Sequence, residues 1–137
     1  MKRTANAQWK GSVKEGKGEL TTQSGILNQT NYSFKTRFTG EEKGTNPEEL
    51  LAAAHAGCFT MAVSFALSEK GIEPAILNTE ATLSMEGFEI SGMHLSITGS
   101  VPGISENEFE EITKAAEQNC LVSKALKIKI TSEAHLI

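Results

Sequence analysis

Residues 46–71, with the sequence NPEELLAAAHAGCFTMAVSFALSEKG, decide the fold because they predict one long apolar helix. Asn46 is a favourable N-cap, and Pro47 suits the first helical position, where its missing N–H costs nothing. An acidic residue three positions after Asn46 completes the spacing of a capping box. The helix should therefore run from Pro47 to about Lys70, and Gly71 can form its C-terminal cap. Apolar side chains occur on nearly every side, so we expect this helix to be buried on most faces.

Strand-like patterns flank the helix on both sides. The preceding residues predict short strands at 4–13, 18–23 and 32–38, and the last of these alternates Tyr32, Phe34, Thr36 and Phe38 with polar residues. The following residues predict two long strands with a tight turn near Glu86-Gly87, then a second helix capped by Ser105, a helical turn and a last strand. These elements should occupy residues 75–86, 88–101, 105–119, 122–126 and 127–133.

This order of elements is typical of an α+β fold with mostly antiparallel sheets around the long helix. We expect a single domain over residues 1–137, with the N-terminal strands in about 1–45 and the central helix, two strands, second helix and last strand in 46–137. One small sheet cannot cover a helix that is apolar on nearly every side. The pattern therefore predicts an intertwined homodimer.

Composition and charge exclude several classes of function. The chain has 137 residues, 39% of them apolar, and a net charge of -4, which argues against nucleic acid as a partner. No apolar run follows the basic residues at the N-terminus, so we expect no secretory signal and a cytoplasmic protein. The long apolar stretch is interrupted by polar residues and fits a core helix better than a membrane span.

Two cysteines, Cys58 and Cys120, lie far apart in the sequence. In a reducing compartment a permanent disulfide between them is disfavoured. They are therefore either two inert core thiols or two thiols that pair transiently during turnover. Zinc fits poorly, because the two cysteines and three histidines show no CxxC or HxxxH spacing.

The position of Cys58 sets a condition for its reactivity. It lies near the middle of the predicted helix, where the helix dipole does not lower the pKa of a thiol, and a buried free cysteine is commonly a small core hydrophobe. A reactive Cys58 would need a cation from elsewhere, and Arg37 is the candidate. Glu48 shares the helix face of Cys58 but lies about 15 Å away along the axis, so an arginine between them could contact both.

His55 offers rival chemistry, because a Cys–His pair can form a nucleophile. His55 precedes Cys58 by three residues and can share its face. An imidazole one turn away on the same helix rarely directs a nitrogen at the thiol, however. We therefore interpret His55 as mainly structural.

The motifs around these residues resemble the OsmC/Ohr family of organic hydroperoxide reductases, and most closely its OsmC (osmotically inducible protein C) branch. The resemblance is carried by the run GTNPEELLAAAHAGCF at 44–59, preceded by YSFKTRF at 32–38, and by the segments GELTTQSGILN at 18–28, VPGI at 101–104 and NCLVSKAL at 119–126. It covers essentially the whole chain. It implies an OsmC-like intertwined α+β homodimer with two active sites at the subunit interface.

The resemblance also implies roles for four residues. Cys58 matches the peroxidatic cysteine and Cys120 the resolving cysteine. Arg37 matches the arginine that stabilises the thiolate, and Glu48 the glutamate that pairs with it. Glu49 is the rival for that last role, although the helical phase favours Glu48.

The implied activity is a thiol-dependent peroxidase that uses no metal or prosthetic group. Cys58 would be oxidised by an organic hydroperoxide, or more weakly by hydrogen peroxide, and then form a disulfide with Cys120. An external thiol reductant such as dihydrolipoamide would restore the enzyme. The chain departs from the family at Leu121, where members often have proline, and the local turn at Cys120 can differ accordingly.

Two alternatives remain open at the level of the sequence. The chain could be a non-catalytic stress or ligand-binding protein on the same fold, with both cysteines structural. It could also be a Cys–His acyl-transfer enzyme, which would depend on His55. Both rank below the peroxidase.

Overall fold

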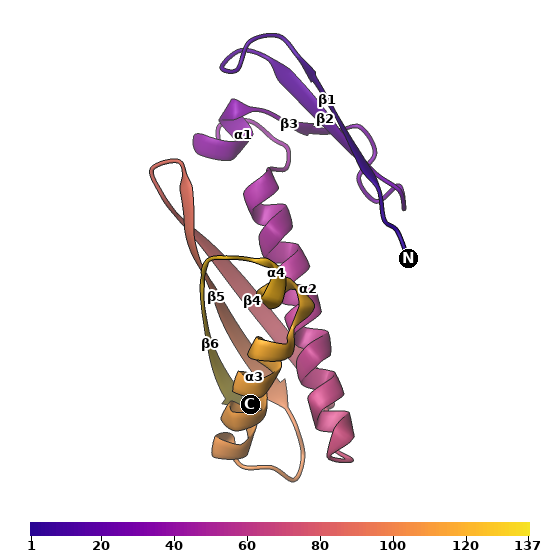
Figure 1. Cartoon of the computed structure of the whole chain (residues 1–137), viewed down its shortest axis with the longest axis vertical. Coiled ribbons are helices and arrows are strands. Elements are labelled where there is room, and N and C mark those ends of the chain that lie inside the picture. Colours follow the sequence, from indigo (N-terminus) through magenta and orange to yellow (C-terminus); the bar gives the residue numbers. More distant parts are fainter. The chain divides into compact units, whose positions relative to one another are not determined.

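The computed structural model describes all 137 residues, which form two compact units, residues 1–50 and 51–137 (Figure 1). The prediction of one domain over the whole chain stays a prediction. The strands are β1 (Ala5–Lys10), β2 (Lys17–Thr22), β3 (Thr30–Tyr32), β4 (Ile76–Glu86), β5 (Glu89–Ser100) and β6 (Lys129–Leu136). The helices are α1 (Phe34–Phe38), α2 (Pro47–Glu69), α3 (Glu106–Asn119) and α4 (Leu121–Ala125).

The first unit contains an antiparallel sheet in the order β1-β2-β3. Trp9 of β1 and Tyr32 of β3 bring their ring centroids to 5.6 Å across the central strand. Gly18 of β2 lies beneath both rings, and a Cβ atom there would come within 2.4 Å of the Tyr32 ring. Every residue of β1 is exposed in the single chain. The sheet is therefore built around an aromatic pair that only a glycine can accommodate.

The prediction of a strand over residues 32–38 is wrong beyond Tyr32, because Phe34–Phe38 form the helix α1. Ser33 is the N-cap of α1, and its hydroxyl accepts a hydrogen bond from the Thr36 N–H. The Thr36 hydroxyl in turn accepts from the Ser33 N–H, at 2.7 Å, which completes a capping box. The rings of Phe34 and Phe38 lie 4.9 Å apart between centroids and are tilted by 54°, in contact as i and i+4 residues of a helix are.

The second unit contains a three-stranded sheet in the order β4-β5-β6. The prediction of mostly antiparallel sheets holds for β1–β2, β2–β3 and β4–β5 but not for the last strand, because β6 runs parallel to β5. A parallel pair needs a long crossover, and α3 and α4 supply it. The predicted turn after Glu86 is present, with Gly87 at φ +62°.

The core lies on one face of this sheet, where α2 and α3 both pack (Figure 1). The inward residues Met93, Leu95 and Ile97 of β5 are in contact with the cluster from both helices. From the helices this cluster receives Phe59, Val63, Leu67, Phe109, Ile112 and Ala116. Ser105 and Glu108 form the predicted capping box at the start of α3. The sheet and these two helices therefore share one core.

Helix α2 spans Pro47–Glu69 and ends before Gly71, which has φ +72°, so the predicted helix is confirmed. By length and composition it could cross a membrane, a criterion that core helices of soluble proteins also meet. Its buried residues form one stripe at four-residue spacing, His55, Phe59, Val63 and Leu67. Met61 and Phe65 are 75% and 65% exposed. A single chain thus covers only one face of α2.

Candidate active site

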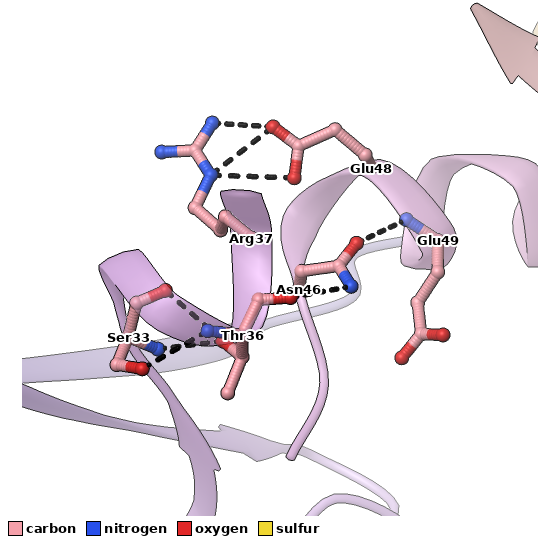
Figure 2. A network of polar contacts seen from close by, with 6 residues as sticks. All are labelled: Ser33, Thr36, Arg37, Asn46, Glu48 and Glu49. Carbon is pink, nitrogen blue, oxygen red and sulfur yellow. Dashed lines mark hydrogen bonds and ion pairs between the residues drawn. The ribbon is translucent and has the colours of Figure 1, made fainter. Parts of the chain in front are cut away.

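Arg37 and Glu48 form an ion pair between α1 and the first turn of α2 (Figure 2). The Nε of Arg37 donates to both carboxylate oxygens of Glu48, at 3.1 and 3.2 Å, and the Nη2 donates to Oε1 at 2.5 Å. This is the forked geometry in which a guanidinium and a carboxylate bind most strongly. The carboxylate is 12% exposed and the guanidinium side chain 37% exposed. The pair therefore fixes the arginine while part of it remains accessible.

Asn46 links the two helices that carry this pair (Figure 2). Its side-chain oxygen accepts from the Glu49 N–H at 2.7 Å, which caps α2, and its side-chain nitrogen donates to the Thr36 carbonyl oxygen of α1 at 3.3 Å. Glu49 itself accepts a hydrogen bond from the Thr45 hydroxyl and makes no ion pair with Arg37. Of the two adjacent glutamates, Glu48 is therefore the partner of the arginine.

The pair holds both groups in their charged forms. The hydrogen bond to Glu48 raises the pKa of Arg37 above its usual value. Burial acts to raise the pKa of Glu48, but the hydrogen bond from Arg37, a backbone hydrogen bond at Glu48 and the charge of Arg37 together outweigh it, and the pKa lies below its ordinary value of 4.5. Near neutral pH the site thus presents a fixed guanidinium.

The two cysteines lie together in the second unit. Cys58 of α2 is half-buried, Cys120 is 1% exposed at the N-cap of α4, and both are free thiols. Both line an open groove of about 800 Å³ between α2 and α3. Most of its other lining residues are apolar, namely Met61, Ala62, Phe65, Ala66, Ala115, Ala116 and Leu121. The fold therefore brings together two thiols that are 62 positions apart in the sequence, at the edge of an apolar groove.

The surroundings of Cys58 favour its thiolate. Burial acts to raise the pKa of Cys58, but hydrogen bonds from the backbone N–H of Val122, the side chain of Cys120 and the backbone N–H of Leu121 together lower it below its usual value. These donors come from the first turn of α4 and from the residue before it. The cause of the lowered pKa is thus a set of hydrogen bonds from another helix.

His55 does not form a nucleophile pair with Cys58. Its ring is completely buried, and Nε2 lies 2.8 Å from the hydroxyl oxygen of Ser123, with which it forms a hydrogen bond. Its other nitrogen, Nδ1, has no hydrogen-bond partner. Neither nitrogen therefore contacts the thiol, and the Cys–His alternative lacks its central contact.

Comparison with known proteins gives the family of the chain. A family model described as OsmC-like protein matches residues 40–134. Peroxiredoxin OsmC of Escherichia coli K12 is 47% identical over 134 residues, which cover 95% of this chain and 93% of the relative. This chain belongs to the OsmC family.

Solved structures agree with the membership of the OsmC family. The crystal structure of the organic hydroperoxide resistance protein OhrB of Bacillus subtilis matches with a TM-score of 0.69 and 26% identity, over 98% of both chains. An OsmC-like protein of unknown function from Vibrio cholerae matches with a TM-score of 0.75 over 98% of this chain and 99% of that one; at 14% identity it supports the fold alone. The OsmC-like α+β fold and the family recognised from the motifs are thereby confirmed.

Each pair of residues singled out in this OsmC-family sequence is joined within one compact unit. Arg37 and Glu48 form their ion pair in residues 1–50, and Cys58 and Cys120 line their groove in residues 51–137. Sequence reasoning missed the backbone donors at Leu121 and Val122. The position of a backbone N–H group cannot be read from a pattern of side chains. The only available signal for these donors was the short helical turn predicted directly after Cys120.

Proposed function

We propose that this OsmC-family protein is a cytoplasmic thiol-dependent peroxidase that reduces organic hydroperoxides in defence against oxidative and osmotic stress. The observation that carries the proposal is the hydrogen-bonded pair of Cys58 and Cys120, in which the pKa of Cys58 is lowered. The names of the relatives, a peroxiredoxin and an organic hydroperoxide resistance protein, support the same activity. The proposed chemistry uses the thiols alone and needs no metal or prosthetic group.

In the first step, the thiolate of Cys58 attacks the terminal oxygen of the hydroperoxide. The S–O bond forms as the O–O bond breaks, the alkoxide takes up a proton and leaves as an alcohol, and Cys58 becomes a sulfenic acid. In the second step, the thiol of Cys120 attacks the sulfenic sulfur, water leaves, and a disulfide forms. A small dithiol such as dihydrolipoamide then reduces this disulfide by two exchange reactions and is itself oxidised to a cyclic disulfide.

Arg37 and Glu48 are proposed to serve the first step. The guanidinium would stabilise negative charge on the thiolate and on the leaving oxygen, and Glu48 would orient it. The forked hydrogen bonds of the pair and the partial exposure of Arg37 support this assignment. Glu48 would act through Arg37 and is a positioning residue.

A homodimer with active sites at the subunit interface is part of the proposal. Met61 and Phe65 are largely exposed in the single chain and line the groove that contains both cysteines. Large exposed side chains of this kind are expected to be covered by a partner, here a second copy of the chain. The apolar lining of the groove also favours organic hydroperoxides over hydrogen peroxide.

The proposal is tested by turnover of cumene hydroperoxide with dihydrolipoamide or dithiothreitol. We expect Cys58→Ser to abolish turnover, because the thiolate that attacks the peroxide is missing and Cys120 is 1% exposed. Cys120→Ser should retain one turnover and then accumulate sulfinic acid on Cys58, because the resolving thiol is missing. Mass spectrometry after one equivalent of peroxide should show a Cys58–Cys120 bond within one chain. Full activity of Cys58→Ser would overturn the proposal.

The main alternative is a non-catalytic stress or ligand-binding protein with structural cysteines. It predicts that Cys58 reacts slowly with a small disulfide reagent near neutral pH, whereas a thiolate reacts quickly. The measurement needs no peroxide, so it separates a reactive thiol from an inert one before any substrate is chosen. The lowered pKa of Cys58 favours the fast reaction.

A further inference from the structure

The hydrogen bond between His55 and Ser123 joins the two segments that hold the reactive thiols. His55 is one helical turn before Cys58 on α2, and Ser123 is three residues after Cys120 on α4. The distance between Nε2 and Oγ is 2.8 Å, and the His55 ring is completely buried. This hydrogen bond joins side chains 68 positions apart in the sequence, and neither side chain is one of the two thiols.

The hydrogen bond helps to hold a helix too short to hold itself. Helix α4 has five residues, and the cap residue Cys120 gives it no side-chain hydrogen bond. A single turn of isolated helix is unstable, so its orientation has to come from tertiary contacts. The backbone N–H groups of Leu121 and Val122, which point at the Cys58 thiolate, belong to this same turn. The hydrogen bond from α2 to Ser123 is one such contact, beside the packing of Val122 against the core.

We propose that His55 and Ser123 are positioning residues for the peroxidase reaction, whose hydrogen bond holds the first turn of α4 and Cys120 in place against Cys58. The inference rests on the proposed function, because it concerns the reactivity of the same thiol. It assigns a role to the one buried histidine that the mechanism does not otherwise use.

The unpaired nitrogen of His55 argues against a purely structural role. Burial lowers the pKa of His55, partly offset by the charge of Glu117, so the ring is neutral near neutral pH. One ring nitrogen is paired with Ser123, and Nδ1 is buried without a partner. An unsatisfied buried polar atom costs free energy, and an apolar residue of similar size avoids that cost. An apolar residue at position 55 would avoid this cost but would lose the hydrogen bond to Ser123.

The same tether affects the second step of the reaction. Cys120 is the residue from which α4 begins, and its carbonyl oxygen accepts the hydrogen bond from the Lys124 N–H. Fixing Ser123 therefore also fixes the approach of the resolving thiol to Cys58. Loss of the tether should slow disulfide formation and increase over-oxidation of Cys58.

The test uses the full chain with Ser123 replaced by threonine, valine or alanine. Threonine and valine have nearly the same shape, and only threonine keeps the hydroxyl. Reduced protein is alkylated with iodoacetamide between pH 5 and 9, a range that includes the ordinary thiol pKa of about 8.5 and extends well below it. Modification of the Cys58 peptide is followed by mass spectrometry, and urea denaturation of each variant confirms that the protein is folded. If Ser123→Ala does not fold, the threonine and valine variants still decide the question.

We expect Ser123→Val and Ser123→Ala to lower the alkylation rate of Cys58 at pH 7 by about three- to ten-fold, which is the effect of losing roughly one net hydrogen bond. Their rate profiles should move to higher pH, while Ser123→Thr should react like the unsubstituted chain. His55→Phe, which keeps an aromatic ring at this position but has no ring nitrogen, should behave like Ser123→Val.

The possible failures are distinct. Equal rates for Ser123→Val and Ser123→Thr, in a chain whose Cys58 reacts fast, would overturn the inference and leave the peroxidase intact. A Cys58 that reacts no faster in the folded chain than in urea would overturn both. A loss of stability without any change in the pH profile would make the contact structural only.

Discussion

Glu48→Gln tests whether the ion pair with Arg37 stabilises the fold as its geometry indicates. The substitution keeps the shape of the side chain and removes the charge that receives the forked hydrogen bonds. Hydrogen bonds to a charged group contribute roughly 1.5–3 kcal/mol when shielded, and exposed ion pairs roughly 0.2–1 kcal/mol. Because the carboxylate is 12% exposed but the guanidinium side chain 37%, the value has to be discounted for solvent. We expect Glu48→Gln to lower the free energy of unfolding by about 1–1.5 kcal/mol at pH 7.

The stabilisation by Glu48 should decrease as the pH falls. The pKa of Glu48 is lower in the folded chain than its ordinary value of 4.5. Its contribution to stability is therefore fully present above pH 4.5 and is lost as the pH falls through the lower, folded value. The difference between the unsubstituted chain and Glu48→Gln should shrink accordingly in urea denaturation curves recorded from pH 7 downward.

Glu49→Gln is the matched control, because this neighbour accepts a hydrogen bond from Thr45 that an amide oxygen can also accept. Its effect should stay below about 0.5 kcal/mol. A double-mutant cycle of Glu48→Gln with Arg37→Met isolates the pair energy from other effects. The reasoning is refuted if Glu48→Gln costs as much at pH 3 as at pH 7, or if Glu49→Gln costs as much as Glu48→Gln.

Two further predictions concern the link between the helices and the exposed face of α2. Asn46→Asp should keep the cap of α2 but lose the hydrogen bond to the Thr36 carbonyl, which should lower the free energy of unfolding in urea by about 1 kcal/mol. Asn46→Ala loses both hydrogen bonds and should lower it by about twice as much. Equal losses in the two variants would contradict this division. Phe65→Glu, on a residue 65% exposed in one chain, should convert the proposed dimer to a monomer in size-exclusion chromatography with light scattering; Phe88→Glu, in the turn between β4 and β5, is the control, and a dimer that persists in Phe65→Glu would place the interface elsewhere.

The segment 32–38 was predicted wrongly for a reason that its residues explain. Phe34 and Phe38 are four positions apart, and a spacing of four satisfies both the two-residue period of a strand and the i, i+4 neighbours of a helix. The deciding signal was polar: Ser33 and Thr36 cap each other's backbone N–H groups and begin a helix. The same reading located α2 correctly, where Asn46 and Pro47 mark the first turn.

Other features could not be predicted because they depend on contacts distant in sequence. The alternation in residues 127–133 predicts a strand, but nothing in it specifies that β6 pairs parallel with β5. The two cysteines were recognised as candidates from their types and from a family resemblance. Their common groove follows from the packing of α2 and α3 on one sheet face.

The source of thiolate stabilisation in the structure changes the role that Arg37 needs to have in the reaction. A cysteine in the middle of α2 is too far from that helix's own N-terminus to benefit from it, and the sequence therefore demanded a cation. In the structure, the N–H groups of Leu121 and Val122 and the side chain of Cys120 supply the stabilisation within residues 51–137. Within this unit the thiolate is therefore stabilised by hydrogen bonds, without a positive charge.

The proposed task of Arg37 accordingly shifts toward the peroxide, whose leaving oxygen gains negative charge as the O–O bond breaks. The two tasks separate in experiment. Arg37→Met should lower kcat/KM for cumene hydroperoxide by about 10²-fold, the cost of removing one donor from a developing oxyanion. The same variant should leave alkylation of Cys58 by iodoacetamide near the rate of the unsubstituted chain, because that reaction senses only the thiolate. An equal loss of rate in both reactions would show that Arg37 mainly stabilises the thiolate and that the backbone donors of α4 contribute less to it.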